Sequence, residues 1–386
     1  MRDVSYLTPV VCYGIVVLAL PASLYLPQGR RTPLLLLVWG LLGYCIWTCH
    51  YLDQIVGLQI GFQVGMSAFI TALHAPIVTG NAPCTAQVNP DGSVRWSFWT
   101  AFKIANNPRA LPSAKNTSST KRSRFLFSIG CLLKLAVILG LRHVAKMLAM
   151  AALSQVSPWD FLPSRQSLVR RLIAGSISRR ELGLRTFISM NWIMTTITEL
   201  EISHTLTKLL FVSVFRVDEP YEWPSLFGDP RDAYTLRRFW GRFWHQLLSP
   251  AAGKWGHAFA KQVLRMQAPS LLKKAFVALF IFSASGTAHM FLAWRSGQPD
   301  PSRAIWFYWI NFAAVCFEIV VSKVLGERAS SSSLRRSGIG PIVKETAKRI
   351  LGFVWVFVFF LWVIPRLEYP TIFHAILSNS LPAKLK

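Results

Sequence analysis

Long apolar runs separated by polar segments are the feature that most constrains this chain. A helix crosses a bilayer with about 20 consecutive, mostly apolar residues. Because lipid offers no hydrogen bonds, spanning segments must satisfy their own backbone groups, which favours helices. The sequence therefore predicts an all-α polytopic membrane protein with about seven or eight transmembrane helices. The runs lie near residues 8–26, 33–50, 54–77, 125–150, 186–214, 275–294, 304–325 and 348–365.

The charge content agrees with this class. Only 15% of the 386 residues are charged, whereas a soluble domain carries about 25%. Basic residues exceed acidic residues, 42 against 17, for a net charge of +25, and most of them lie between the apolar runs. Basic loops of this kind face the cytosol. Because these residues flank membrane runs and form no separate module, the pattern argues against nucleic-acid binding.

Two of the runs leave the topology open. The run at 125–150 is interrupted by a histidine and a lysine, and the run at 186–214 is longer than one span requires. The basic loop 78–124 is predicted to be cytosolic, but 151–185 is also strongly basic. Two basic loops on either side of one span cannot both be cytosolic if that span crosses the membrane once. Either 125–150 enters the membrane and returns, or it lies along the interface.

The N-terminal run and the cysteines bear on processing and on metal or disulfide chemistry. Residues 7–26 resemble a secretory signal, but the positive segment before them is weak and another apolar run follows closely. A first transmembrane helix is therefore expected. The cysteines show no CxxC pair and no His/Cys metal spacing, so neither a disulfide framework nor a metal site is predicted. They are Cys12, Cys45, Cys49, Cys84, Cys131 and Cys316.

One histidine lies inside a run of spanning length. His289 falls within 281–294 (IFSASGTAHMFLAW), near the end of the run. An ionisable side chain inside a membrane span is costly, which marks it as a candidate functional residue. On helical spacing it shares a narrow stripe with Ser285 and Gly286, where a ligand or another backbone can approach closely. The alternative is a histidine that only hydrogen-bonds to a neighbouring helix.

A second histidine ends an amphipathic pattern in the long polar connection 216–270. After Pro230, Arg238 and Arg242 lie on one face of an expected helix together with His245. Aromatic residues opposite arginines are typical of a helix that lies in the membrane interface. Anchoring to the surface explains the arginines adequately, but it does not explain the histidine. The apolar face comprises Leu236, Phe239, Trp240, Phe243, Trp244 and Leu247.

Carboxylates are scarce, and two of them lie in the middle of the run 186–214. Glu199 and Glu201 are expected to be structural partners of Lys208 or His204. If instead they donate protons, the chain would be a membrane terpene cyclase, which needs intramembrane acids. A small-molecule transporter is a further alternative that rests only on the number of helices. It predicts internal repeats of inverted topology, and none is evident.

The two histidines suggest acyl transfer. A buried neutral histidine can act as a general base on a hydroxyl, because desolvation disfavours its charged form. No motif for a covalent acyl- or phospho-enzyme is present, so the other substrate must already be activated, as a thioester is. Arg238 and Arg242 could hold the phosphates of coenzyme A. The apolar acyl chain or the acceptor alcohol would lie between helices.

Three motifs resemble the membrane-bound O-acyltransferase superfamily, and more narrowly its wax-synthase-like branch in fungal secondary metabolism. They are 223–228 (WPSLFG), 236–246 (LRRFWGRFWHQ) and 285–289 (SGTAH). Their order matches, with the last one inside a span. The resemblance covers 186–365 well and the first 120 residues only in general character. It implies an MBOAT-like fold in one integral-membrane domain, 1–386, with N-terminal helices in 1–77 and a catalytic core in 186–365.

The resemblance also implies roles for individual residues. His289 corresponds to the intramembrane histidine taken as the base, and His245 to the residue that orients the acyl thioester. Arg238, Arg242, Trp244, Ser285 and Gly286 are expected to contact the substrates. The expected substrates are acetyl-CoA, or another acyl-CoA, and a hydrophobic alcohol. Membrane lipid is expected to surround the protein, and no bound cofactor, metal or nucleic acid is expected.

The branch acetylates hydroxyls of terpenoid or meroterpenoid intermediates, whereas its plant wax synthases join long-chain acyl-CoA to fatty alcohols. The first activity is the one expected here, in a multi-pass protein of the endoplasmic reticulum. The chain departs from the family pattern at two places. The segment 107–113 (NPRALPS) lacks the glycines and tryptophan of the family, and Met290 stands where relatives often have glutamate.

Overall fold

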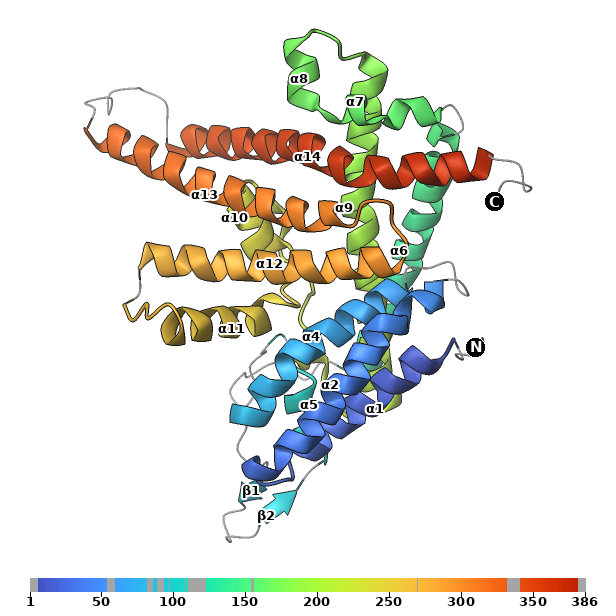
Figure 1. Ribbon diagram of the computed structural model, residues 1–386, viewed down its shortest axis with the longest axis vertical. Coiled ribbons are helices and arrows are strands. Elements are labelled where there is room, and N and C mark those ends of the chain that lie inside the picture. Colours follow the sequence, from blue (N-terminus) through green and yellow to red (C-terminus); the bar gives the residue numbers. More distant parts are fainter. Residues whose placement is uncertain are drawn as a thin grey trace. The chain divides into compact units, whose positions relative to one another are not determined.

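The computed structural model confirms the predicted all-α polytopic membrane architecture, apart from one short hairpin (Figure 1). The chain forms two compact units. Unit 1 consists of Met1–Pro112 and Gln246–Trp309, and unit 2 consists of Ser113–His245 and Ile310–Lys386. The structure describes residues 6–53, 60–81, 86–88, 94–96, 98–107, 109, 123–153, 156–268, 270–331 and 341–380.

Unit 1 contains the N-terminal helices and the two helices before residue 300. The helices α1, α2 and α4 pack around an apolar core that includes Val16, Leu42 and Ala68. The side chain of Arg31 is buried, with 3% exposed, and it donates to the carbonyls of Leu24, Leu26 and Thr79. These hydrogen bonds satisfy carbonyl groups at the C-terminal ends of α1 and α4. The elements are α1 (Thr8–Ser23), η1 (Gln28–Arg30), α2 (Arg31–Thr48), η2 (Cys49–Leu52), α4 (Ile60–Asn81), β1 (Ala86–Val88), β2 (Val94–Trp96), α5 (Phe98–Ala105), α11 (Ser249–Gln262) and α12 (Leu271–Arg295).

Within unit 1, α11 lies beside α12 and both contact α4 (Figure 1). A small apolar cluster joins the three helices, with Ile70 from α4, Ala252 from α11 and Ile281 from α12. Trp255 of α11 adds a hydrogen bond from its indole to the carbonyl of Leu73 on α4. These contacts fix α12, the helix that carries His289, against the N-terminal helices.

Unit 2 is built around α6, α9 and α14. The ion pairs Lys134–Glu201 and Arg142–Glu199 join α6 to α9. The helix α13 begins in unit 1 and continues into unit 2. The elements are α6 (Arg124–Leu153), η3 (Pro158–Phe161), α7 (Pro163–Gln166), α8 (Leu168–Ile173), α9 (Arg179–Lys208), η4 (Leu209–Val214), η5 (Pro220–Glu222), η6 (Pro230–Asp232), α10 (Leu236–Arg238), η7 (Phe239–Phe243), α13 (Ser302–Ser331) and α14 (Pro341–Ser380).

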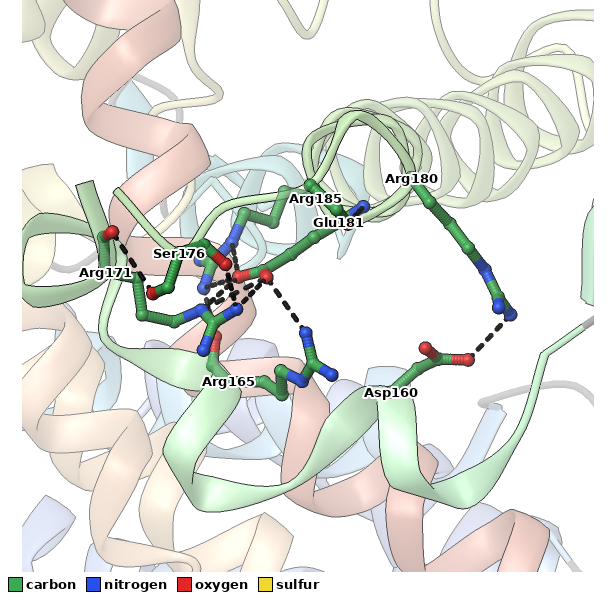
Figure 2. Close-up of polar contacts among 8 residues, drawn as sticks. Asp160, Arg165, Arg171, Ser176, Arg180, Glu181 and Arg185 are labelled. Atoms are coloured by element: carbon green, nitrogen blue, oxygen red, sulfur yellow. Dashed lines mark hydrogen bonds and ion pairs between the residues drawn. The ribbon is translucent and has the colours of Figure 1, made fainter. Parts of the chain in front are cut away.

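An arginine cluster around one buried carboxylate joins the basic loop of unit 2 to the start of α9 (Figure 2). Glu181, 5% exposed, accepts hydrogen bonds from Arg165, Arg171 and Arg185. Burial raises the pKa of Glu181, but Arg171 and Arg185 outweigh it, and the pKa lies below the ordinary value of 4.5. A second pair, Arg180 with Asp160, lies beside the cluster. Much of the predicted basic charge in 151–185 therefore has a structural partner.

Six helices are long and apolar enough to cross a membrane, which refines the predicted spans among the described residues. They are Arg31–Leu52, Ile60–Gly80, Arg124–Ala151, Leu271–Arg295, Ser302–Val324 and Glu345–Leu377. Two of the predicted spans are not among them. The helix α1 has only 16 residues, and α9, which starts at Arg179 rather than 186, carries charged side chains that lower its hydropathy. The helix α6 continues without reversal from Arg124 to Leu153, so the idea that 125–150 enters and returns is wrong.

Candidate active site

His289 lies on α12, a helix of 25 residues that begins with a side-chain cap. The hydroxyl of Ser270 accepts the backbone N–H of Lys273, which satisfies one orphan donor of the first turn. The imidazole of His289 is half-buried between the rings of Phe62 on α4 and Tyr308 on α13, with ring centroids 5.2 Å and 5.1 Å away. It forms no hydrogen bond with any other residue that the structure describes, so its ring nitrogens are not committed to a structural partner there.

The small residues near His289 allow another helix to come close. A Cβ atom at Gly286 would lie 3.0 Å from Cα of Ile305 and 3.2 Å from Cβ of Tyr308. The absence of a side chain at Gly286 therefore brings the first turns of α13, and with them Tyr308, against α12. Ser285 is half-buried, and Ser283 accepts a hydrogen bond from the indole of Trp309. Gly286 is thus a helix-packing position, one of the two uses that its spacing suggested.

His245 follows a short helical segment rather than the long helix that the sequence predicted. Residues 236–243 form α10 and a single π-helical turn, and Trp244 is already extended, with φ −67° and ψ 149°. The expected helix through Leu247 is therefore wrong at its C-terminal end. The backbone N–H of Gly228 donates to the carbonyl of Phe243, and a Cβ atom at Gly228 would lie 2.1 Å from the carbonyl oxygen of Arg242. This contact with the 223–228 motif closes the turn.

The aromatic side chains of this segment are packed inside unit 2. Phe239, Phe243 and Trp244 are buried, and Trp244 stacks on Trp192 of α9 with a centroid distance of 5.8 Å and an interplanar angle of 1°. The half-buried imidazole of His245 contacts Trp244 and the edge of Phe227, at 5.5 Å and 5.8 Å. Trp244 therefore supports His245 by packing.

Arg238 and Arg242 differ in their surroundings. The guanidinium of Arg238 is ion-paired with Asp232 and lies 4.5 Å above the ring of Tyr234. The hydrogen bond to Asp232 raises the pKa of Arg238. The guanidinium of Arg242 is 3.9 Å from Asp232, and its side chain is 59% exposed. Of the two, Arg242 is the more accessible to a phosphate group.

Two polar residues of α13, which the sequence reasoning did not select, hold the segment that ends at His245. Both oxygens of Glu318 accept hydrogen bonds from the backbone at Leu236 and Arg237. The amide oxygen of Asn311 accepts the indole N–H of Trp240 at 2.9 Å. Both residues lie in the apolar run 304–325, so the membrane cost that singled out His289 could have found them too.

The predicted site residues are thus divided between the two units. His289, Ser285 and Gly286 belong to unit 1, and Arg238, Arg242, Trp244 and His245 belong to unit 2. Within the described ranges, no group of three or more His, Cys, Asp or Glu side chains could hold a metal ion. Of the departing motif 107–113, only Asn107 and Arg109 fall among the described residues.

Comparison with known proteins shows what the part of the chain that carries the site residues is similar to. Residues 223–310 match the model of the membrane bound O-acyl transferase family. The match includes the segment that ends at His245 and the part of α12 that carries His289. The resemblance predicted from the three motifs is therefore confirmed.

The individual relatives are fungal acetyltransferases. The acetyltransferase ataH of Aspergillus terreus is 31% identical over 40% of this chain and 48% of its own length. The acetyltransferase nanB of Aspergillus nanangensis is 30% identical over 44% of this chain and 39% of its own, and aurG of Calcarisporium arbuscula is 29% identical over 55% and 48%. The chain thus spans about half the length of these relatives or less. No solved structure matches it significantly.

Proposed function

We propose that this chain is an acyl-CoA-dependent O-acyltransferase that moves an acetyl group from acetyl-CoA to a hydroxyl of a terpenoid or meroterpenoid intermediate of secondary metabolism. The observation that carries the proposal is the family match over 223–310, which contains both predicted histidines. The fungal relatives named acetyltransferases support acetyl as the group transferred. The proposed location is the membrane of the endoplasmic reticulum, which suits both the apolar helices and an apolar acceptor.

His289 is the proposed general base. Its half-buried imidazole has no hydrogen-bond partner among the described residues, so a ring nitrogen can accept the proton of an acceptor hydroxyl. The acceptor oxygen then attacks the thioester carbonyl, and the tetrahedral intermediate collapses with cleavage of the carbon–sulfur bond. The coenzyme A thiolate leaves with the proton from the imidazolium. The products are the ester and free coenzyme A, and no further reactant is required.

The remaining predicted residues have proposed supporting roles. His245 orients or polarises the thioester, with Trp244 packed against it at 5.5 Å. Arg242 is the better placed of the two arginines for a phosphate of coenzyme A, since Arg238 is paired with Asp232. Ser285 and Gly286 lie one turn before His289 on α12, and the acceptor alcohol would pass along this helix.

Labelled acetyl-CoA tests the proposed function directly. Microsomes that carry wild-type protein, incubated with a terpenoid extract, are expected to form a labelled ester soluble in organic solvent. The variant His289→Ala should form no labelled ester, although the variant protein accumulates to the wild-type level. The variant His257→Ala is a matched control, because His257 is an exposed histidine of α11 within the same family match.

The result can also reject the proposal. Equal transfer by wild type and His289→Ala would remove His289 from the mechanism. If wild type transfers no label from acetyl-CoA, long-chain acyl-CoA and fatty alcohols are tested in the same assay. Transfer only from those substrates would replace the acetyltransferase by a wax-ester synthase, and no transfer from any acyl-CoA would reject acyl transfer.

A further inference from the structure

The segment 236–245 cannot hold its own shape. It consists of α10, three residues long, and one π-helical turn of five residues. Isolated helices shorter than about 12 residues are marginal in water because nucleation is unfavourable. The conformation that presents His245 must therefore come from contacts with other parts of unit 2.

Thr235 and Glu318 accept the hydrogen bonds of four successive N–H groups at the start of this segment, those of residues 236–239. Thr235 accepts the N–H of Arg238 with its hydroxyl and the N–H of Phe239 with its carbonyl, at 3.1 Å and 2.7 Å. The N–H groups of Leu236 and Arg237 donate to Glu318 at 2.6 Å and 2.9 Å. A helix start normally leaves four such donors without an intrahelical partner. Here the partner for two of them comes from α13, 81 and 82 residues further along the chain.

The carboxylate of Glu318 is itself held in place. Its Oε1 atom accepts a third hydrogen bond from the indole of Trp355 on α14, at 2.7 Å. Glu318 lies within Ser302–Val324, a helix apolar enough to cross a membrane. A carboxylate there is costly unless its oxygens are satisfied. Its two oxygens meet three N–H donors, and two of these belong to the start of the segment that ends at His245.

We propose that Glu318 is a positioning residue for the transfer reaction, because it fixes the start of the segment 236–245 and thereby the orientation of His245. This inference rests on the proposed function for its kinetic consequence, although the structural part stands without it. Asn311 assists from one side through Trp240, and Gly228 fixes the opposite end through Phe243.

Hydrogen exchange and kinetics of Glu318→Gln test the inference together. Glutamine has nearly the same size, but its NH2 group replaces one acceptor oxygen. One of the two backbone N–H groups would therefore face another donor and lose its hydrogen bond. The amides of Leu236 and Arg237 should exchange faster in the variant, measured by mass spectrometry of peptides from protein in lipid nanodiscs. The kcat for acyl transfer should fall about 10- to 100-fold, the size expected when a catalytic group is displaced. The KM for acyl-CoA should change less than about threefold, because ground-state binding is retained.

Three further variants keep the test interpretable. Glu318→Asp retains a carboxylate and should recover part of both properties relative to Glu318→Gln. Trp355→Phe removes only the third donor and should have a smaller effect. Glu199→Gln is the matched control, because Glu199 is also a carboxylate of unit 2 but pairs with Arg142 on α6. In Glu199→Gln, hydrogen exchange of the backbone amides in 236–245 should equal that of wild type.

The outcomes separate the two proposals. Unchanged exchange in 236–245 of Glu318→Gln overturns the inference, whether or not the protein transfers acyl groups. Faster exchange together with unchanged kcat also overturns it, since the segment would then not matter for transfer. Absence of transfer by wild type itself would instead reject the proposed function, and the exchange data would still decide whether Glu318 fixes the segment.

Discussion

The two regions that carry the candidate histidines are built in opposite ways. His289 lies inside α12, in its C-terminal half, where 25 helical residues and a Ser270 cap define the backbone locally. His245 lies after an eight-residue helical segment whose start is held by Glu318, 82 residues further along the chain, and whose end is held by Gly228. The backbone of the first region is therefore defined by its own helix, and that of the second depends on contacts with other segments.

Both imidazoles lie against aromatic rings. His289 contacts the rings of Phe62 and Tyr308 and forms no hydrogen bond with any other residue that the structure describes. His245 lies in an aromatic cluster with Trp244 and Phe227. The ring-centroid distances are similar, 5.1–5.2 Å for His289 and 5.5–5.8 Å for His245. The division of labour proposed for the two histidines comes from the resemblance to the family, in which His289 corresponds to the base and His245 to the residue that orients the thioester.

The largest expected effect separates the two histidines by their kinetics. His289→Gln should lower kcat about 10²- to 10⁴-fold, the usual contribution of a general base. His245→Gln should lower it less, because the amide can still donate a hydrogen bond to the thioester. The measurement is kcat and KM for acetyl-CoA at saturating acceptor. If His245→Gln loses as much as His289→Gln, the two histidines share the proton transfer and the contrast fails.

A second prediction contrasts Glu181 with Glu318. Glu181→Gln should lower the stability of unit 2 by about 3–5 kcal/mol, because it leaves the buried guanidinium of Arg185 without its carboxylate. Arg185, at 0% exposure, is affected most. The catalytic rate of the molecules that remain folded should be unchanged. Thermal unfolding in nanodiscs measures the loss, and a matched variant is Glu345→Gln, which removes an exposed carboxylate paired with Arg349.

The same residue gives a pH dependence. The pKa of Glu181 is lowered in the folded state, so its contribution to stability is present above the ordinary value of 4.5 and is lost as pH falls through the folded pKa. Wild type should therefore lose stability below about pH 4.5, and Glu181→Gln should lose less over the same range. Parallel curves for the two proteins would contradict the proposed charge network.

A third prediction tests the closed end of the segment that carries His245. A Cβ atom in Gly228→Ala would lie 2.1 Å from the carbonyl oxygen of Arg242, so the backbone must shift. The shift should cost about 1–3 kcal/mol of stability and lower kcat by about 10- to 100-fold. Gly241→Ala is the matched control, because Gly241 lies in the same segment and has no atom within 4 Å of that position. Equal losses in both variants would mean that the contact with 223–228 is unimportant.

The sequence predicted those parts of the molecule that local chemistry decides. The apolar runs gave most of the long helices, and the cost of an ionisable group within a run singled out His289. The helical periodicity around Arg238 correctly predicted a helix there, but the same periodicity in the sequence extends to Leu247, beyond the end of the helix in the structure. The helix ends before Trp244, beside the hydrogen bond between Gly228 and Phe243, a contact that helical spacing does not encode.

The partners of the intramembrane carboxylates were the harder part. Glu199 and Glu201 were expected to have structural partners on their own helix, yet they form ion pairs with Arg142 and Lys134 of α6. Glu318 received no role, although it lies in an apolar run as His289 does. Such pairings depend on which helices become neighbours, and a single sequence without its fold leaves that choice open.

The smallest expected effect concerns the arginine face of the segment 236–245. Arg242→Ala should raise the KM for acetyl-CoA about two- to fivefold, because an exposed cation contributes about 0.2–1 kcal/mol to a phosphate contact. Arg242→Lys should restore most of this, and high salt should reduce the difference between the variants. Arg231→Ala is the control, since Arg231 is exposed and already paired with Asp229. A KM that responds to Arg231 as much as to Arg242 would indicate a general effect of surface charge, and Arg242 would then lose its assignment as the phosphate contact of the segment that carries His245.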